Sequence, residues 1–447
     1  MRVIVVGAGE VGSYVADRLS RQGIDVFVIE RDRLRAAHLA ETLDVEVVHG
    51  SGTHPTTLAA AGLDSADLLV AVTKNDEANI VASMLAKNAD VPRTVVRIEA
   101  SELRGREASA LRRASGADLI IDPDEETAQE VLSLIEMPGA SEVAELGNGE
   151  VWVIGARVLA EAPIVGKSLK QLGTENEPEW DYIVSSIRRG DETIIPRGDY
   201  LIEPNDLIRV VCKRSARRKV AKLLGLARDV PREILLLGGG RTATLVAQKL
   251  QGTSARVQII ERETDRARDV AEMLDGVRVL QGDVTDSDVL DEADLSRVEL
   301  VAALTGEDDA NILASIYAKS YGVPETIAVV HRLNFLNLLD QVGVDATLSP
   351  RTATANAVLR FVRGDIAKVA TFLSGELELL ELEIHSGSMA DGKEIRELGM
   401  PRDVLIAAIT RDGRSQIARG RTLLRKGDHV IVIAEPDSVD VVVKAFD

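Results

Sequence analysis

The amino terminus carries the pattern in this chain that is best suited to chemistry. Gly7, Gly9 and Gly12 have the G-x-G-x-x-G spacing and directly follow the apolar run 3–6, which has the composition of a buried strand. In such a turn Gly7 permits a sharp change of direction, Gly9 lets a pyrophosphate approach the backbone, and Gly12 lets the next helix pack on the strand. The free N–H groups of that helix would face the phosphates. The pattern therefore predicts a phosphate-binding turn.

A carboxylate follows at the distance that a ribose site requires. Glu30 ends a second apolar run, 24–29, and lies 23 residues after Gly7, where a ribose-binding acid is expected. Its charge would oppose a 2′-phosphate, so NAD(H) or an adenine nucleotide fits better than NADP(H), although the adjacent Arg31 partly offsets this preference. A glycine pattern alone also occurs in simple turns, but strand, helix and acid together favour nucleotide binding.

The following residues alternate between strand-like and helix-like patterns. Apolar runs of strand length occur at 3–6, 24–29, 45–48, 68–72, 94–98 and 119–121. Helical patterns at 34–43 and 80–88 and polar loops at 50–55 and 74–79 separate them. After the last run, Asp122, Asp124, Glu125 and Glu126 suit the start of a helix that runs to Ile135. This order predicts a doubly wound α/β unit with a parallel sheet.

The same series begins again after Pro231. Three residues of the first copy, Gly7, Gly9 and Glu30, recur 231 residues later as Gly238, Gly240 and Glu261. Segment 300–319 repeats segment 68–87 with a displacement of 232, and both contain closely similar phrases, DANILAS and EANIVAS. Agreement of this kind at matching places indicates an internal duplication.

Each copy is followed by a shorter segment with a different pattern. Strand-like runs occur at 150–158, 183–188 and 207–211, and again at 379–384, 404–409 and 429–433. Glycine-bearing turns between them indicate a small α+β module. We therefore predict Rossmann-like domains at 1–138 and 231–363 and small modules at 139–226 and 364–447, with a helix at 216–226 near the middle boundary.

Composition limits the class of partner. The net charge of −19 argues against nucleic acid or an anionic membrane surface as a partner. The single cysteine, Cys212, excludes an internal disulfide framework, suits a reducing cytoplasm and is expected to be a small buried hydrophobe. No apolar run approaches the roughly 18 residues that span a bilayer, and the chain enters a strand without a leader. We expect it to act on a membrane only through a partner.

The tandem arrangement, the loop GSGTHP at 50–55 and the phrases AVTKNDEANIVAS and ALTGEDDANILAS resemble the TrkA family of cytosolic regulatory subunits of Trk potassium uptake systems. The repeats of that family are RCK (KTN) domains, and the resemblance covers essentially the whole chain. It implies that the glycine-rich domains bind NAD(H) or ATP/ADP. It further implies a ring of paired domains, formed by a tetramer, that gates a TrkH-type membrane potassium channel at the inner face of the membrane.

The resemblance also implies where the nucleotide contacts lie. The phosphate contacts fall on Gly7, Ala8, Gly9, Glu10, Val11 and Gly12. The ribose falls on Glu30 with Arg31 beside it, and the pocket is completed by Ser51, Gly52, Thr73, Lys74 and Arg97. Gly238, Gly240 and Glu261 are the corresponding residues of the second copy. These loops follow the carboxyl ends of successive strands, where open α/β sheets bind ligands.

The second copy departs from the first at several of these positions. Ala243 replaces the third glycine, Arg241 and Thr242 replace Glu10 and Val11, and Val329 replaces Arg97. Arg241 would add positive charge near the phosphates and could favour ATP or ADP over a dinucleotide. It could equally be a solvated arginine at a helix start. Occupancy of the second site is therefore open.

An NAD-dependent oxidoreductase of unknown substrate is the main alternative, because many folds of this kind transfer hydride. Such chemistry needs a substrate domain with a positioned acid or base, and the small modules are too short for one. His49 and His54 could hold a metal, but no third ligand is apparent. We therefore expect neither a catalytic residue nor a metal. The basic run 213–219 suits a solvated helix face or docking to an acidic partner loop.

Overall fold

The computed structural model describes residues 1–21, 23–100, 113, 115–190, 192–226, 229–332, 335, 339, 342–362, 369–373 and 377–446. Contacts divide the chain into two compact units, residues 1–126 with 351–370 and residues 127–350 with 371–447. Two six-stranded parallel sheets and two smaller antiparallel sheets confirm the predicted fold class. The predicted domain boundaries stay a proposal, and the one at 363 and 364 lies outside the described residues.

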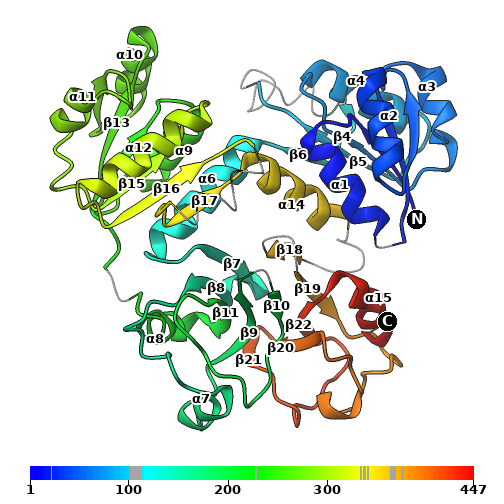
Figure 1. Cartoon of the computed structure of the whole chain (residues 1–447). Helices are drawn as coiled ribbons and strands as arrows, with labels where there is room; N and C mark the ends of the chain where they lie inside the picture. The colour runs from blue at the N-terminus through cyan, green and yellow to red at the C-terminus, as the bar shows by residue number, and fades with distance from the viewer. Residues whose placement is uncertain are drawn as a thin grey trace. The chain divides into compact units, whose positions relative to one another are not determined.

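The sheet of the first unit is wholly parallel (Figure 1). Its strands are β1 (Arg2–Val6), β2 (Asp25–Glu30), β3 (Glu46–His49), β4 (Leu68–Ala71), β5 (Arg93–Arg97) and β6 (Leu119–Ile121). They lie in the order β3-β2-β1-β4-β5-β6, so the chain passes from one side of β1 to the other between β3 and β4. Ligands bind at such a switch point, outside the carboxyl ends of the strands.

Helices cover the sheet because its strands are apolar on both sides. They are α1 (Glu10–Ser20), α2 (Arg33–Thr42), α3 (Pro55–Ala60) and α4 (Asp76–Asn88). Ile4 and Val6 of β1 pack with Leu58 and Ile80 in one buried cluster, so α3 and α4 cover that face. In α1 the buried residues Val11, Val15 and Leu19 recur every four positions, as on the buried face of an amphipathic helix.

Helix α14 (Pro350–Val362) follows the second repeat in sequence but belongs, from Arg351 onward, to the first unit. Arg360 pairs with Glu126 at 2.6 Å, and Arg93 donates to the carbonyl oxygen of Val362 at 3.3 Å. Conversely, α6 (Pro123–Glu136) follows the first repeat, and its residues from Thr127 onward belong to the second unit. Each unit therefore includes part of a helix that sequence order would assign to the other.

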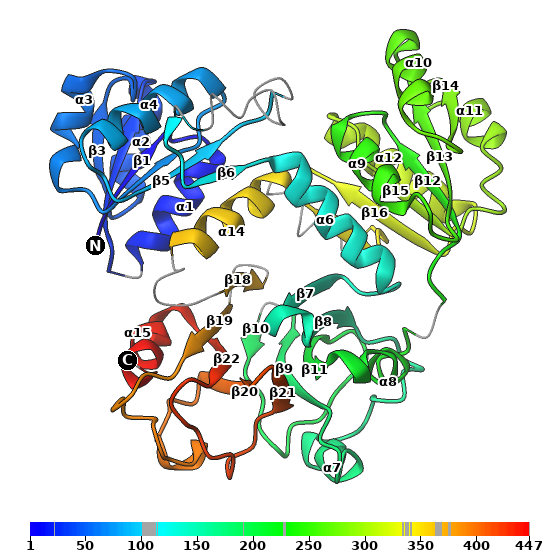
Figure 2. The same ribbon diagram turned by 180° about the vertical axis from the view of Figure 1, so that it is seen from behind.

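The second unit repeats the same sheet (Figure 2). Its strands are β12 (Glu233–Leu237), β13 (Arg256–Glu261), β14 (Arg278–Gln281), β15 (Leu300–Ala303), β16 (Glu325–Val329) and β17 (Ala346–Leu348), in the order β14-β13-β12-β15-β16-β17. Its helices are α9 (Arg241–Leu250), α10 (Thr264–Met273), α11 (Ser287–Glu292) and α12 (Asp308–Ser320). Equal strand order in both copies confirms the duplication.

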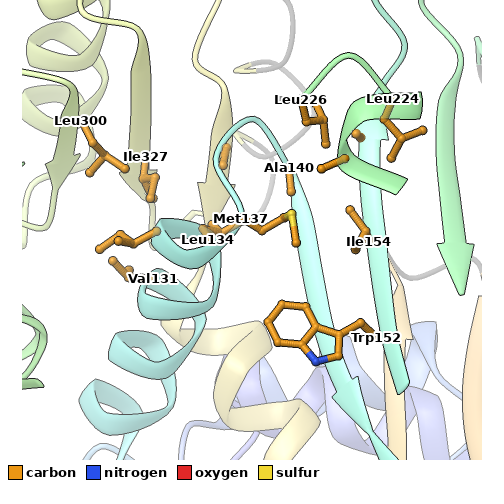
Figure 3. Close-up of a cluster of buried hydrophobic side chains, with 14 of the residues drawn as sticks. Val131, Leu134, Met137, Ala140, Trp152, Ile154, Leu224, Leu226, Leu300 and Ile327 are labelled. Carbon is orange, nitrogen blue, oxygen red and sulfur yellow. The ribbon is translucent and has the colours of Figure 1, made fainter. Parts of the chain in front are cut away.

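The later part of α6 packs into the core of the second unit (Figure 3). Val131 and Leu134 lie against Leu300 of β15 and Ile327 of β16, and all four side chains are buried. The chain then continues through Met137 and Ala140, which belong to the same buried cluster as Trp152 and Ile154 of the first small module. Burying several aliphatic side chains at about 1.5–3 kcal/mol each fixes this helix on its sheet.

The small modules are antiparallel sheets with short helices. The first contains β7 (Glu142–Leu146), β8 (Val151–Arg157), β9 (Tyr182–Arg189), β10 (Glu192–Ile194), β11 (Leu207–Lys213), α7 (Leu169–Glu175) and α8 (Arg217–Leu223). The second contains β18 (Val369–Leu373), β19 (Leu377–Glu383), β20 (Val404–Arg411), β21 (Arg414–Ile417), β22 (His429–Ala434) and α15 (Val439–Phe446). Their strand orders, β10-β9-β11-β8-β7 and β18-β19-β22-β20-β21, are equivalent when one is reversed.

The predicted strands of both repeats are present, but one helix begins earlier than predicted. The segment 74–79 was expected to be a polar loop, whereas α4 already begins at Asp76. The side chain of Asn75 accepts a hydrogen bond from the N–H of Ala78 and so caps the helix. The polar character of this segment reflects a capped first turn. The helix places Asp76 and Asn79 at the edge where ligands bind.

Candidate functional site

The glycine turn has the geometry that phosphate binding requires. Gly7 has a φ of +103°, a left-handed conformation that favours glycine. A methyl group built on Gly12 would lie 1.9 Å from the carbonyl oxygen of Gly7, so strand and helix approach closely there. A methyl group on Gly9 would meet no atom within 4 Å. The space beside Gly9 is therefore open, at the N-terminal end of α1.

Glu30 ties this turn to the end of β2. Its carboxylate accepts hydrogen bonds from the N–H of Ala8 and the N–H of Asp32, each at 2.7 Å, and its side chain is only 8% exposed. Arg35 lies 3.8 Å from the same carboxylate. Each carboxylate oxygen keeps lone pairs beyond these bonds. Glu30 can therefore accept from ribose hydroxyls without leaving its place.

Asn79 joins the ends of β4 and β5. Its side-chain oxygen accepts from the N–H and the hydroxyl of Thr73 at 3.0 and 2.6 Å. Its side-chain nitrogen donates to the carbonyl oxygens of Thr73 and Arg97 at 3.0 and 2.9 Å. Thr73 in turn packs under the glycine turn, since a methyl group on Gly7 would lie 2.9 Å from its Cγ2. Two predicted site residues, Thr73 and Arg97, are thus linked through one buried amide.

The other predicted residues of the first pocket lie on the same edge of the sheet. Ser51 bonds Thr53 at 2.8 Å between hydroxyl oxygens, in the loop after β3. Gly52 faces β1, where a methyl group would lie 2.2 Å from Val6. Lys74 and Arg31 are exposed at the ends of β4 and β2. Each predicted position therefore follows a neighbouring strand, as the fold requires.

Sequence reasoning missed two groups of residues at this site. Asp76 accepts from the backbone N–H groups of Glu99 and Ala100 at about 3 Å, and Asn79 was quoted only as part of a repeated phrase. The repetition of that phrase in both copies was the available signal. Arg351, whose guanidinium pairs with Glu10, comes from α14 and carries no sequence signal.

The second repeat reproduces most of this geometry. Glu261 accepts from the N–H groups of Gly239 and Glu263 at 2.6 and 2.8 Å. Asn311 accepts from the N–H of Thr305 at 3.0 Å and donates to the carbonyl oxygen of Val329 at 2.8 Å. These bonds match those of Glu30 and Asn79. The second crevice therefore has the same backbone frame as the first.

The second crevice differs in its charged side chains. Val329, at the position of Arg97, is buried, and Ala243 is buried at the position of the third glycine. Arg266 donates to the carbonyl oxygen of Gly239 at 2.9 Å, next to Gly240, where a methyl group would again meet no atom within 4 Å. The two sites share a frame but present different charges to a ligand.

The candidate residues outside the two pockets are Cys212, the basic run 213–219 and His49, and their side chains contact other parts of the fold. Cys212 is fully buried, and burial raises its pKa to about 12. Burial alone would raise the pKa of Asp181, but hydrogen bonds from Lys213 and Lys219 of the basic run hold it below its usual value. The Nε2 atom of His49 lies 3.2 Å from the carbonyl oxygen of Arg31, which accepts a hydrogen bond when that nitrogen carries the proton. Across the described residues, no group of three or more potential ligands could hold a metal.

In the described part of the chain, no helix has both the length and the apolar character needed to cross a membrane.

Family models match both repeats. The TrkA-N domain model matches residues 3–131 and again 234–350. The TrkA-C domain model matches residues 153–225 and 379–447.

Relatives match over nearly the whole chain. The Trk system potassium uptake protein TrkA of Halomonas elongata is 32% identical over 438 residues, which cover 97% of this chain and 95% of that protein. The protein of the same name from Haemophilus influenzae is 31% identical and covers 100% and 98%. Among solved structures, the GsuK RCK domain matches with a TM-score of 0.61 at 18% identity, covering 100% of this chain and 94% of that one. The GsuK channel bound to NAD matches with a TM-score of 0.60 at 18% identity, covering 100% and 78%. At this identity the structural matches concern the fold.

Proposed function

The chain belongs to the TrkA family, and from this premise we propose that it is a nucleotide-sensing regulatory subunit of a potassium uptake system. Proteins of this family are regulatory subunits rather than enzymes, so the oxidoreductase alternative is set aside. The proposed partner is a TrkH-type channel subunit. The chain would act in the cytoplasm and reach the membrane through that partner.

The proposed ligand of the first site is supported by three features that lie together in the structure. The open space at Gly9, the start of α1 and the buried carboxylate of Glu30 lie together at the switch point of the first sheet. The helix start attracts phosphate, and the carboxylate binds ribose while opposing a 2′-phosphate. NAD(H) is therefore the proposed ligand of the first site, through the thirteen residues predicted for that pocket, among which Glu10 contributes its backbone. The relative solved with NAD has the same fold.

ATP or ADP is the proposed ligand class of the second site. Arg241 stands where the first site has Glu10, so the second helix start carries a cation in place of an anion. A guanidinium suits terminal phosphates. Val329 removes the polar contact that Arg97 offers in the first site. These differences favour a smaller, more highly charged ligand.

Regulation requires that the ligand bind the arrangements of the ring with different affinity. A coupling of roughly 1 to 3 kcal/mol per site is typical, and several equivalent sites acting together shift a channel strongly. A ligand that contacts loops from several strands is well placed to exert such a preference. The regulatory step would then be a change in the angle between neighbouring domains.

Glu30→Gln is expected to weaken NAD(H) binding by about tenfold and to reduce the effect of nucleotide on potassium uptake. The glutamine amide has one oxygen in place of two, so its NH₂ group faces one of the two backbone N–H donors and one of the two possible ribose acceptors is lost. Calorimetric titration of NADH, NAD, ATP and ADP measures the affinity. Uptake by cells that lack their own TrkA-type subunit measures the function.

Glu261→Gln is the matched control for that experiment. It makes the same change in the second repeat and should leave the first site intact. Failure of the wild-type chain to bind any of the four nucleotides would refute the proposed function. Restored uptake without any nucleotide response would refute the sensing role.

We also propose that the chain self-associates through exposed apolar side chains on two corresponding helices. Helices α4 and α12 expose large apolar side chains at corresponding positions, Val81 and Met84 in one and Leu313 and Ile316 in the other. These four side chains are 37% to 59% exposed. Apolar clusters that recur on an outer helix face favour a protein contact. We assign this face to contacts between copies in a tetrameric ring.

The double substitution Val81→Glu with Met84→Glu is expected to reduce the tetramer to a smaller species, because charges would be buried in the contact. Sedimentation velocity measures the change in mass. Leu34→Glu provides the control, since Leu34 of α2 is 83% exposed and lies outside this face. An unchanged mass for the double variant would exclude α4 from the assembly.

A further inference from the structure

Arg351 brings a positive charge from the second half of the sequence to the first glycine turn. It follows β17 along the chain but belongs to the first unit. Its guanidinium pairs with the carboxylate of Glu10, which is the first residue of α1. The arginine side chain is 24% exposed and the glutamate side chain 49%. The pair therefore stands at the end of the helix to which a phosphate would bind.

At the start of α1, a phosphate is a better partner for Arg351 than the carboxylate of Glu10. A carboxylate at the helix start opposes the approach of a phosphate, whereas a guanidinium matches phosphate geometry with two parallel hydrogen bonds. Burial also lowers the pKa of Arg351, because partial loss of hydration disfavours its charged form. The charge of Arg351 is thus poorly hydrated and gains from a close anion.

The difference in exposure decides which of the two side chains can move. Glu10 is half exposed and can rotate into solvent, where its charge is hydrated at little cost. Arg351 is more deeply placed on α14, and α14 is held in the first unit by the Arg360–Glu126 pair at 2.6 Å. A phosphate that enters at Gly9 would therefore displace Glu10 and find Arg351 in position.

We propose that Arg351 binds the nucleotide phosphate of the first site, exchanging Glu10 for the ligand. This inference rests on the proposed function of that site. It makes the first pocket a composite, in which residues 1–126 supply the turn and the ribose acid while α14 supplies a phosphate ligand. Nucleotide binding in the first repeat is then linked directly to the position of a helix that follows the second repeat.

A cation stands at this position of α14 but not at the corresponding position of the first repeat. In the first repeat β6 ends at Ile121 and is followed by Asp122, Pro123 and Asp124. In the second repeat β17 ends at Leu348 and is followed by Ser349, Pro350 and Arg351. The residue that corresponds to Arg351 is therefore the acid Asp124. If the start of this helix needed a particular charge for its own stability, both repeats would carry the same sign, and they do not.

Arg351→Ala is expected to weaken ADP and NAD binding by about tenfold or more, since a charge-assisted contact to phosphate is lost. Adenosine, which has no phosphate, should bind wild type and variant equally. Arg351→Lys keeps the charge without the paired donors and should lose less. Calorimetric titration of the full chain gives these values, with Gly240→Asp present in every protein so that only the first site is titrated.

Glu10→Gln distinguishes a phosphate ligand from a merely structural ion pair. Exchange of partners predicts that this variant binds ADP as tightly as wild type or more tightly, because the competing carboxylate is gone. If Glu10→Gln and Arg351→Ala weaken ADP and adenosine alike, the pair only holds α14 and the inference is wrong. Unchanged ADP affinity in Arg351→Ala also refutes it while leaving the proposed function standing. No nucleotide binding by wild type would refute both.

Discussion

Gly9→Asp is expected to abolish nucleotide binding at the first site while leaving the fold intact. Gly9 has φ −69° and ψ −178°, an extended conformation that any residue adopts, and a side chain there meets no atom within 4 Å. Aspartate is also a favourable residue at the start of a helix. The protein therefore tolerates the new side chain, and its effect falls on the ligand.

The expected loss is large because two like charges would be forced together. A carboxylate about 4 Å from a phosphate costs on the order of 4 kcal/mol at a partly buried site, which corresponds to at least a hundredfold loss in affinity. Gly9→Asn separates charge from size, since it fills the same space without charge and should lose less. Calorimetry gives the affinity, and thermal unfolding confirms that the fold is retained.

Gly240→Asp is the matched variant of the second repeat. Gly240 has φ −64° and ψ 178° and equal free space, so the substitution is structurally equivalent. If both sites bind nucleotide, each single variant should remove one binding event per chain. Binding that survives Gly9→Asp at full stoichiometry would move the ligand away from the first glycine turn. The uptake assay then shows which site controls transport.

Much of the fold could be predicted because its signals are local. Each strand is a short apolar run, and each glycine turn has a fixed spacing, so the strands of both sheets and their duplication follow from the residues near them. Glu30 could be placed at the ribose position for the same reason. The patterns in the small modules are weaker, and β7, β10, β18 and β21 were not predicted.

The parts that could not be predicted depend on contacts distant in sequence. Arg351 reaches Glu10 only because α14 belongs to the unit formed by residues 1–126. Sequence order places residues 350–362 with the second repeat and says nothing about which sheet that helix covers. Asn79 was hidden in a different way, because a polar residue in a polar segment suggested a solvated loop. Its full burial follows from the early start of α4.

Asn79→Ala is the second large effect expected, and it acts on the frame of the site. The amide makes four hydrogen bonds, two with donors of Thr73 and two with the carbonyl oxygens of Thr73 and Arg97. It is fully buried, so the groups left behind lose their partners away from water. The local free energy of opening should fall by about 3 kcal/mol. Hydrogen exchange of the peptides that contain β4 and β5 measures this loss.

Nucleotide affinity should fall as well, because the loop at Thr73 supports the glycine turn. Thr73 lies so close to Gly7 that a methyl group there would be 2.9 Å from its Cγ2. Release of Thr73 would loosen the turn and cost roughly tenfold in affinity, since misplacement of a preorganised site weakens every contact it makes.

Asn311→Ala tests whether the effect is transmitted locally. It removes the same four bonds in the second repeat, where Asn311 holds Thr305 and Val329. Exchange should then rise in β15 and β16, while the first site keeps its affinity. A loss of first-site affinity in both variants would mean that the two repeats respond as one unit. Unchanged affinity in Asn79→Ala would show that the glycine turn holds its shape without the loop beneath it, and that phosphate binding depends on α1 alone.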